Sequence, residues 1–241
     1  MENEFKRKAV CIKSSDNGDA DRIVTLLTLE EGKIKAKMKG VKKAKAKLSF
    51  ASFPFCFGEY LWVKRGNFCT ITNCNFIDNF SPLLQDMNLY YAGCAMLEIV
   101  DLVTKENQEN DELFLILVKS LNTLAYNTNA NIFAVLAKFM FEVLKNVGYA
   151  VMFDDSVIDL TNWQNQHNAY FDFESGVFSY EKTEVCLSLT PKEAQAFVEL
   201  CKKEMSEYDN TFDCPKNVVK ILVQFFELRV DEALRIIKQF C

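Results

Sequence analysis

Apolar and polar residues alternate, or form short β-branched runs, as far as about residue 80. Such period-two patterning is typical of strands. Turn-forming residues, including the run SSDNGDAD at 14–21, separate the apolar stretches. Strands are therefore predicted at residues 5–13, 22–29, 33–39, 60–63 and 68–72. About five short strands in so short a segment predict a small closed barrel.

From Ser81 onward, apolar residues recur every three or four positions, which is typical of amphipathic helices. Ser81 and Pro82 are expected to start the first helix, and Gly148 to end the third. Thr190, followed by Pro191 and by Glu193 three residues on, predicts a capping box. The predicted helices span residues 81–103, 112–126, 132–147, 191–205, 215–228 and 230–240.

Residues 150–189 have no clear period and contain short alternating pieces, such as YFDFESGVFSY at 170–180, between turn residues. The predicted fold class is therefore α+β and multidomain. A β-barrel domain is expected at residues 1–80, and a helical domain at residues 81–241 with an irregular or β insert at about 150–189.

One predicted strand carries a lysine at every second position. Its apolar residues, Ile34, Ala36 and Met38, are expected to face the core, and its lysines to face outward. More lysines follow Gly40, and residues 33–47 contain eight lysines and no acidic residue. Most lysine runs are simply solvated surface. This density of uncompensated charge instead favours a polyanion with regularly spaced phosphates as the partner.

The net charge of −5 conceals an asymmetry between the two predicted domains. Residues 1–80 contain fifteen Lys and Arg against nine Asp and Glu, a net charge of +6. Residues 81–241 contain thirteen against twenty-four, a net charge of −11. This division predicts an anionic ligand for the barrel and a different partner for the helical domain. Because lysines attract phosphates without reading bases, binding is expected to be independent of sequence.

The composition, 49% apolar and 25% charged residues, is that of an ordinary globular protein. No signal-peptide pattern and no apolar run near eighteen residues is present, so a cytoplasmic protein without membrane contact is expected. The nine cysteines are scattered through apolar segments, which favours reduced thiols over disulfides. Cys69 and Cys74, for example, are predicted to lie in the core.

The chain lacks the usual signs of catalysis. His167 is the single histidine and stands in a polar segment. There is no phosphate-binding glycine loop and no CxxC pair, and Asp154, Asp155 and Asp159 read as solvated loop acids. No enzyme activity, catalytic residue, metal site or cofactor is therefore expected.

Three phenylalanines, Phe53, Phe55 and Phe57, cluster between the lysine stretch and the next strand. They could stack on bases, as in proteins that bind single strands. Burial in the barrel core is the commoner role of phenylalanine and is favoured here.

Residues 17–48, NGDADRIVTLLTLEEGKIKAKMKGVKKAKAKL, resemble the N-terminal signature of the RecO family of bacterial recombination mediators. The matching elements are Gly18 to Thr28, the run Gly32-Lys33-Ile34, and Lys39 to Leu48, and a weaker likeness extends to Gly148-Tyr149. The resemblance implies an oligonucleotide/oligosaccharide-binding (OB) barrel followed by a helical domain.

The resemblance also implies binding of single- and double-stranded DNA, annealing of complementary strands, and loading of RecA onto strands coated by single-strand-binding protein. The implied protein partners are RecR and the acidic C-terminal tail of single-strand-binding protein, and the implied location is the cytoplasm, at the nucleoid. The residues predicted to contact DNA are Arg22, Lys33, Lys35, Lys37, Lys39, Lys42, Lys43, Lys45, Lys47, Lys64 and Arg65.

The sequence departs from the family in one respect. Many members carry a four-cysteine zinc element just after the position of Tyr149. Here Phe153-Asp154-Asp155-Ser156 stands where the first cysteine pair would be, and only Cys186 lies near the second. Zinc is therefore expected to be absent.

Two other classes of function compete with the mediator interpretation. A barrel that binds structured RNA, as in translation or ribosome assembly, has the same composition and differs only in lacking the 17–48 motif. A nuclease or nucleotidyl-transfer enzyme would need a nucleotide loop or a convergent carboxylate set, which the sequence does not offer.

Overall fold

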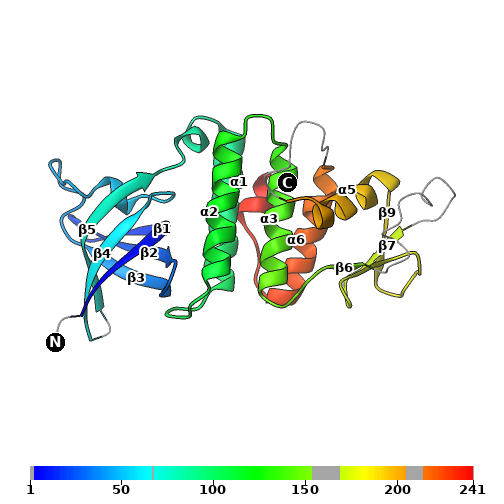
Figure 1. The fold of residues 1–241 in the computed structure, drawn as a ribbon, viewed down its shortest axis with the longest axis horizontal. Helices are drawn as coiled ribbons and strands as arrows, with labels where there is room; N and C mark the ends of the chain where they lie inside the picture. The colour runs from blue at the N-terminus through cyan, green and yellow to red at the C-terminus, as the bar shows by residue number, and fades with distance from the viewer. Residues whose placement is uncertain (1–2, 67, 154–168, 205–213, 241) are drawn as a thin grey trace. The chain divides into compact units, whose positions relative to one another are not determined.

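The computed structural model describes residues 3–66, 68–153, 169–204 and 214–240 (Figure 1). The chain divides into two compact units. The first comprises Met1–Gln85 together with Leu97–Val118, and the second comprises Asp86–Met96 together with Lys119–Cys241. Each unit is described by itself below.

The first unit is built on a closed five-stranded barrel with the strand order β1-β2-β3-β5-β4. The strands are β1 (Asn3–Asn17), β2 (Asp21–Thr28), β3 (Gly32–Met38), β4 (Phe57–Arg65) and β5 (Phe68–Asp78). The neighbouring strands are antiparallel except for β3 and β5, whose parallel pairing involves only Ala36 with Cys69 and Lys37 with Thr70. This closure confirms the predicted barrel, and its five strands match an OB fold.

Side chains that alternate along the strands fill the barrel. Ile34, Ala36 and Met38 all point inward, as the alternation along β3 predicts. Tyr60 and Trp62 are the largest core residues of β4, and the ring of Phe5 stacks on Trp62 at 5.6 Å between centroids. Cys69 and Cys74 are also buried, as predicted.

The prediction of a loop over residues 14–21 is wrong. The strand β1 continues to Asn17, and Ser14, Ser15, Asp16 and Asn17 pair with the first residues of β2. The turn shrinks to the three residues 18–20, where Gly18 has a φ of +73°. Local turn preferences of serine and aspartate are weak beside a ladder of antiparallel backbone hydrogen bonds.

The first half of β3 is covered by a segment distant in sequence. This segment joins α1 (Met87–Val103) to α2 (Asp111–Tyr126). The backbone N–H of Asn107 donates to the carbonyl of Lys33 at 2.9 Å, and residues 33 and 106 form an isolated parallel bridge. Because β5 pairs only with Ala36 and Lys37 in the second half of β3, the edge of the first half would otherwise be left unpaired.

The start of the first long helix differs from the prediction at Ser81. Ser81–Leu84 forms a short 3-10 helix, η2, preceded by Phe80 with a φ of +48°. The helix α1 starts only at Met87, where the Asp86 carboxylate accepts the N–H groups of Asn88 and Leu89. Aspartate is as good an N-cap as serine. Asp86 directly precedes α1, so it caps the regular helix in place of Ser81.

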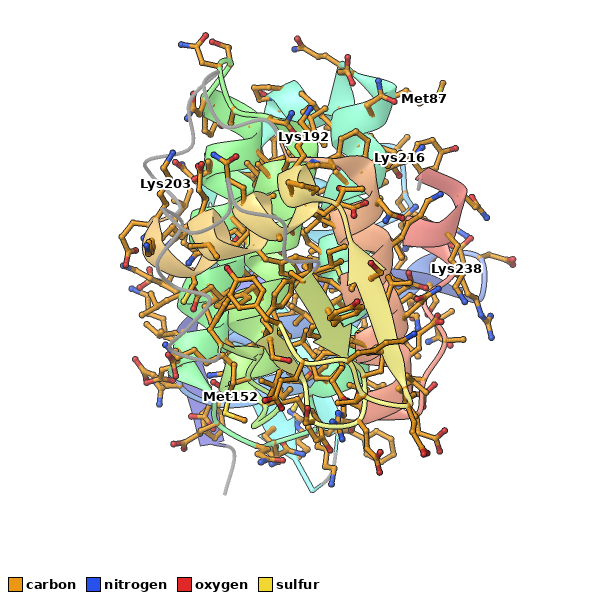
Figure 2. The ribbon with its side chains drawn as sticks, turned by 90° about the vertical axis from the view of Figure 1, so that its right-hand side faces the viewer. Met87, Met152, Lys192, Lys203, Lys216 and Lys238 are labelled. Atoms are coloured by element: carbon orange, nitrogen blue, oxygen red, sulfur yellow. The ribbon has the colours of Figure 1, made fainter. Side chains whose placement is uncertain are left out.

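The second unit is built around α3, most of whose residues are buried. Besides the start of α1 and the end of α2, its described helices are α3 (Ile132–Asn146), α5 (Pro191–Lys202), α6 (Lys216–Val230) and α7 (Ile236–Phe240). The predicted capping box at Thr190 is present, and Gly148 ends α3 with a φ of +89°. Asn217 donates to Glu193 at 2.6 Å, so the first turns of α5 and α6, marked by Lys192 and Lys216, lie together (Figure 2).

The described parts of the predicted insert, residues 150–153 and 169–189, contain a small sheet with the order β6-β8-β7-β9. Its strands are β6 (Met152–Phe153), β7 (Ala169–Asp172), β8 (Val177–Ser179) and β9 (Cys186–Leu189). Phe171 and Phe178 are buried against Phe197 of α5, and Phe171 also packs on Phe225 of α6. This aromatic cluster attaches the sheet to the helices of the second unit. His167, Asp154, Asp155 and Asp159 lie outside the described residues.

Both the backbone conformation and the close neighbours of position 32 require a glycine there. Its φ is +67°, and a Cβ built on it would stand 1.9 Å from the carbonyl oxygen of Gln108. We expect Gly32→Ala to lower the free energy of unfolding by about 2–4 kcal/mol, through left-handed strain plus overpacking. Urea titration followed by circular dichroism measures this loss.

Gly18→Ala is the matched control for this substitution. Gly18 has a similar φ of +73°, but a Cβ there would meet no atom within 4 Å. The control should therefore lose only the strain contribution, about 1 kcal/mol. Equal losses in the two variants would show that the approach of Gln108 to β3 is unimportant for stability.

Candidate nucleic-acid interface

The lysine-rich strand β3 does not present a uniform row of charges. Lys33 is only 8% exposed, and its ammonium group donates to the carbonyl oxygen of Asp101 at 2.6 Å and to its carboxylate at 3.0 Å. Lys33 thus lies on the outer face of the barrel, as expected, but it is buried there and not open to solvent. Alternation along β3 places the side chain correctly on the outer face, but it contains no sign that residues 97–118 cover that end of the strand.

The pair formed by Lys33 and Asp101 is reinforced by Lys13, whose ammonium lies 3.2 Å from the same carboxylate. Burial of the Asp101 carboxyl works to raise its pKa. The hydrogen bonds and charges of Lys33 and Lys13 outweigh this effect, so the pKa of Asp101 lies below its usual range. Asp101 is therefore ionised at neutral pH, and Lys33 serves to hold the last turn of α1 against the barrel.

Several of the other predicted cations face outward but have carboxylate partners. Lys35 pairs with Glu106 at 2.5 Å, and Lys37 pairs with Asp21 at 2.9 Å. The Asp16 carboxylate forms ion pairs with both the Lys42 ammonium, at 2.7 Å, and the Arg22 guanidinium, at 3.4 Å. These cations lower the pKa of Asp16 and Asp21, and the Glu106 carboxylate raises the pKa of Lys35. The local field around these cations is thus partly neutralised.

Four further lysines are exposed and have no acidic partner among the ion pairs of the described residues: Lys39, Lys43, Lys45 and Lys47. We call these residues the loop lysines. Exposed ammonium groups without a carboxylate at ion-pair distance keep more of their charge available to an external anion. The loop lysines place four such groups within nine residues of the chain, although Lys39 also helps to lower the pKa of Asp21.

The loop that carries these lysines is compact. Backbone hydrogen bonds connect Gly40 to Lys43, Lys43 to Ala46 and Ala46 to Ser49, each spanning three residues. Its start is held to the β1–β2 turn, because Asp21 accepts the N–H of Gly40 at 2.8 Å. Gly40 itself has a φ of +70°, which permits the sharp turn after β3. The loop lysines are therefore displayed on a folded segment.

Lys64 and Arg65 lie near the tip of the β4–β5 hairpin, opposite Cys69 and Phe68. Because Cys69 pairs in turn with Ala36, the hairpin cations are separated from β3 by the width of β5. The structure thus distributes the predicted DNA contacts over β3, the loop after it, and this hairpin tip. Their individual roles in binding stay predictions.

The three clustered phenylalanines have different environments. Phe55 is buried, as predicted, whereas Phe57 is half-buried and packs on Phe80 and Phe114. The predicted burial is wrong for Phe53, which is 50% exposed, with the Arg22 guanidinium 4.4 Å from its ring centroid. The ring of Phe76 is also exposed and was not among the predicted site residues; its position among the outward-facing asparagines of β5 was the available signal.

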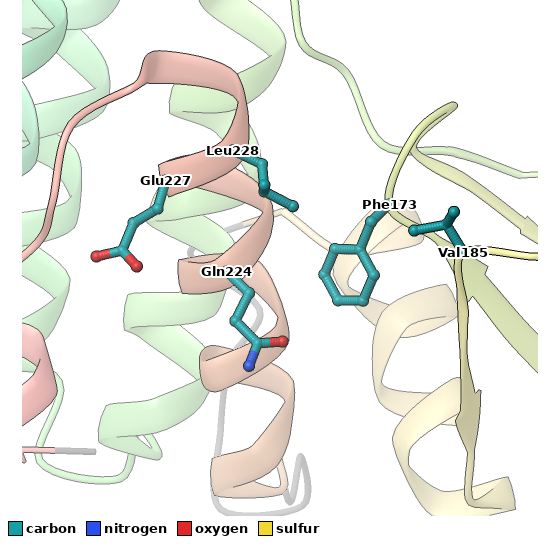
Figure 3. Close-up of a pocket in the computed structure, with 5 residues that line it drawn as sticks. All are labelled: Phe173, Val185, Gln224, Glu227 and Leu228. Carbon is teal, nitrogen blue, oxygen red and sulfur yellow. The ribbon is translucent and has the colours of Figure 1, made fainter.

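The second unit contains a pocket of about 410 Å³ that is lined by Phe173, Val185, Gln224, Glu227 and Leu228 (Figure 3). Phe173 faces the side of α6 that carries Gln224 and Leu228. The one charged lining residue is Glu227, which pairs with Lys238 at 2.8 Å. The mainly apolar pocket therefore lacks the positive charge that phosphates require, and the candidate nucleic-acid interface is the lysine-rich surface of the barrel.

Among the described residues, no group of three or more His, Cys, Asp or Glu side chains is placed to hold a metal ion. Cys186, the cysteine nearest the expected zinc position, is half-buried in β9 with its thiol donating to the Thr183 carbonyl. The helices of the described chain include none long and apolar enough to cross a membrane.

A closed five-stranded barrel with a lysine-rich loop, continuing into a helical unit, defines an OB-fold protein with a helical second domain. Two family models match this chain: Recombination protein O N terminal, over residues 1–80, and Recombination protein O C terminal, over residues 84–235. The chain belongs to the RecO family.

Curated relatives agree with this assignment. A protein of Clostridium novyi named DNA repair protein RecO is 34% identical over 64% of this chain and 60% of its own length. Proteins with the same name from Clostridium kluyveri and Bacillus subtilis are 29% and 32% identical over 69% and 53% of this chain. The matched stretches cover 65% and 50% of those two relatives. The chain thus matches less than two thirds of the length of each.

Lys33 is expected to stabilise the fold in a way that its neighbours on β3 do not. Lys33→Met would leave Asp101 partly buried with Lys13 as its remaining cation, and should lower the free energy of unfolding by about 1–3 kcal/mol at pH 7. Because the pKa of Asp101 is lowered by folding, this contribution exists above pH 4 or so and disappears as the pH falls through the folded-state pKa. Urea titrations at pH 7 and near pH 3 measure both effects.

Lys35→Met provides the control on the same strand and face. Lys35 is exposed and its ion pair with Glu106 is solvated, so the loss should be below about 0.5 kcal/mol at either pH. A loss in Lys33→Met that does not depend on pH would contradict the assigned role of Asp101.

Proposed function

We propose that this protein binds DNA through the loop lysines and acts as a non-enzymatic mediator in DNA repair and recombination. The observation that carries the proposal is the set of exposed ammonium groups without carboxylate partners on one compact loop of an OB-type barrel. Membership in the RecO family and the names of its relatives support the choice of DNA.

The chemistry of the loop predicts how DNA is bound. Lysine attracts phosphate as a point charge, and base readout requires bidentate side chains that the loop does not contain. Binding is therefore independent of sequence and includes both single- and double-stranded DNA. Affinity comes largely from the release of counterions and decreases steeply with salt.

Annealing follows from the same charge neutralisation. Two complementary strands repel each other through their phosphates, and a cationic surface that holds one strand lowers the repulsion for the second. We further propose that the protein works with RecR and the acidic tail of single-strand-binding protein to load RecA, and that it acts at the nucleoid. The family resemblance supports this part of the proposal.

Removing three loop lysines should change the salt dependence of binding. For Lys43→Gln, Lys45→Gln and Lys47→Gln together, the slope of log K against log salt for a single strand should become less negative by about 2 units. Fluorescence anisotropy with a labelled oligonucleotide at several salt concentrations measures the slope. Melting should be nearly unchanged, because exposed charges contribute little to stability.

The charge-matched control replaces Lys35, Lys37 and Lys42 with glutamine. Both triple variants remove three positive charges, but the control removes lysines that already have carboxylate partners. For the control variant, the slope of log K against log salt should change by clearly less than the change of about 2 units expected for the loop variant. If the control changes the slope as much as the loop variant, net charge rather than the loop lysines determines binding.

The protein should accelerate annealing of complementary oligonucleotides coated by single-strand-binding protein, without nucleotide or divalent metal. A quenched fluorophore pair on the two strands follows the reaction, and the triple loop variant should lose most of the acceleration. Annealing at the uncatalysed rate would contradict the proposal. So would a clear preference for structured RNA when RNA and single-stranded DNA compete at fixed salt, which is the outcome expected of an RNA-binding barrel.

A further inference from the structure

Three phenylalanine rings are exposed on the barrel close to the lysine loop. Phe50 is 37% exposed, Phe53 is 50% exposed and Phe76 is 54% exposed. The rings of Phe50 and Phe76 are in edge contact, with 5.8 Å between their centroids. Exposed rings that contact each other on the surface of a folded barrel indicate a binding surface more than isolated apolar residues do.

Two of these rings belong to the same run of turns as the loop lysines. Backbone hydrogen bonds connect Ala46 to Ser49, Leu48 to Ala51, and Phe50 to Phe53 within this run. Lys47, Phe50 and Phe53 are exposed and follow one another at intervals of three residues. Phe50 opens the short 3-10 helix η1 (Phe50–Ser52), and Phe53 is its C-cap residue with an extended backbone. The segment thus places one exposed ammonium group and two exposed rings within seven residues of the chain.

The ring of Phe53 is held in place by polar neighbours. The guanidinium of Arg22 lies 4.4 Å from its centroid, and the same guanidinium donates to the Ser52 hydroxyl at 3.0 Å and pairs with Asp16. Arg22 thus covers one face of a ring that is still half exposed. A fixed ring with an open face needs little ordering when a flat ligand stacks on it.

We propose that Phe50, Phe53 and Phe76 form a platform on which unpaired bases of a single strand stack. The occupant follows from charge complementarity, because Lys47 and the other loop lysines attract a polyanion to this segment. Of the polyanions, a single strand also offers exposed aromatic faces, whereas a duplex keeps its bases stacked inside. This inference rests on the proposed binding of DNA by the loop lysines and extends it.

Stacking of this kind would suit annealing. A ring contacts the face of a base and leaves its hydrogen-bonding edge free. A strand held by its phosphates on the loop lysines and by base faces on the platform would still present those edges to a complementary strand. The platform therefore adds a preference for single strands to the sequence-independent binding by lysine.

The test compares two strands of equal length and charge, an oligothymidylate and an abasic strand without bases. Phe50→Ala, Phe53→Ala and Phe76→Ala should each weaken oligothymidylate binding by about 5-fold to 150-fold. The affinity for the abasic strand and the salt slope should not change. Unchanged oligothymidylate affinity in all three variants would overturn the inference, as would equal losses for the two strands.

Two further variants keep the test specific. Phe68→Ala removes a ring that is 81% exposed at the start of β5, eight residues and about 25 Å along the strand from Phe76, and should leave both affinities unchanged. Phe53→Trp keeps a stacking ring and should retain affinity. Its fluorescence, measured above the background of the unsubstituted protein, should be quenched by oligothymidylate and not by the abasic strand. A lack of quenching would contradict stacking on this ring.

The triple loop variant separates the two proposals. One outcome is that the lysine substitutions reduce the affinity for both strands equally while the phenylalanine substitutions reduce neither affinity. In that case the platform is wrong and the proposed function stands. If the lysine substitutions reduce the affinity for neither strand, the proposed function itself is wrong.

Discussion

The contact of β3 with the last turn of α1 and the segment that follows it is the constraint on which the first unit depends. Gly32 leaves room for the Gln108 carbonyl, Lys33 binds Asp101, and Asn107 adds a hydrogen bond to the exposed edge of β3. The edge needs this cover because β5 pairs only with Ala36 and Lys37, near the end of β3. A lysine, a glycine and a distant backbone segment together cover the start of the strand, which β5 leaves unpaired.

The lysines of this stretch differ in the partners that the fold gives them. Lys33 is used internally, Lys35, Lys37 and Lys42 are balanced by carboxylates, and the loop lysines are left for an external anion. The division has a physical basis, because an ammonium near a carboxylate contributes less to the field that attracts phosphate. The proposed DNA surface is accordingly a loop on a rigid barrel, as is common for binding sites. Two of the three rings of the proposed platform, Phe50 and Phe53, lie on the continuation of that loop, and the third, Phe76, contacts Phe50 from β5.

Local sequence predicted a large part of this fold. The alternation along β3 identified Ile34, Ala36 and Met38 as core, and the spacing of Thr190, Pro191 and Glu193 identified the start of α5. The longer motif in residues 17–48 indicated the family, which the matches over both halves of the chain establish. Such features depend on residues close in sequence, so they can be predicted without knowledge of the tertiary structure.

Other features were decided by tertiary contacts. Ser14 to Asn17 form strand against their turn preference because β2 pairs with them, and Lys33 is buried because residues distant in sequence cover it. Phe53 and Phe55, two residues apart, are exposed and buried respectively, and Phe53 contacts Arg22 of β2. The sequence alone determined the barrel, the helices and the charge of the lysine stretch. Only the tertiary structure decided which of those charges and rings face the solvent, because exposure depends on what the rest of the chain covers.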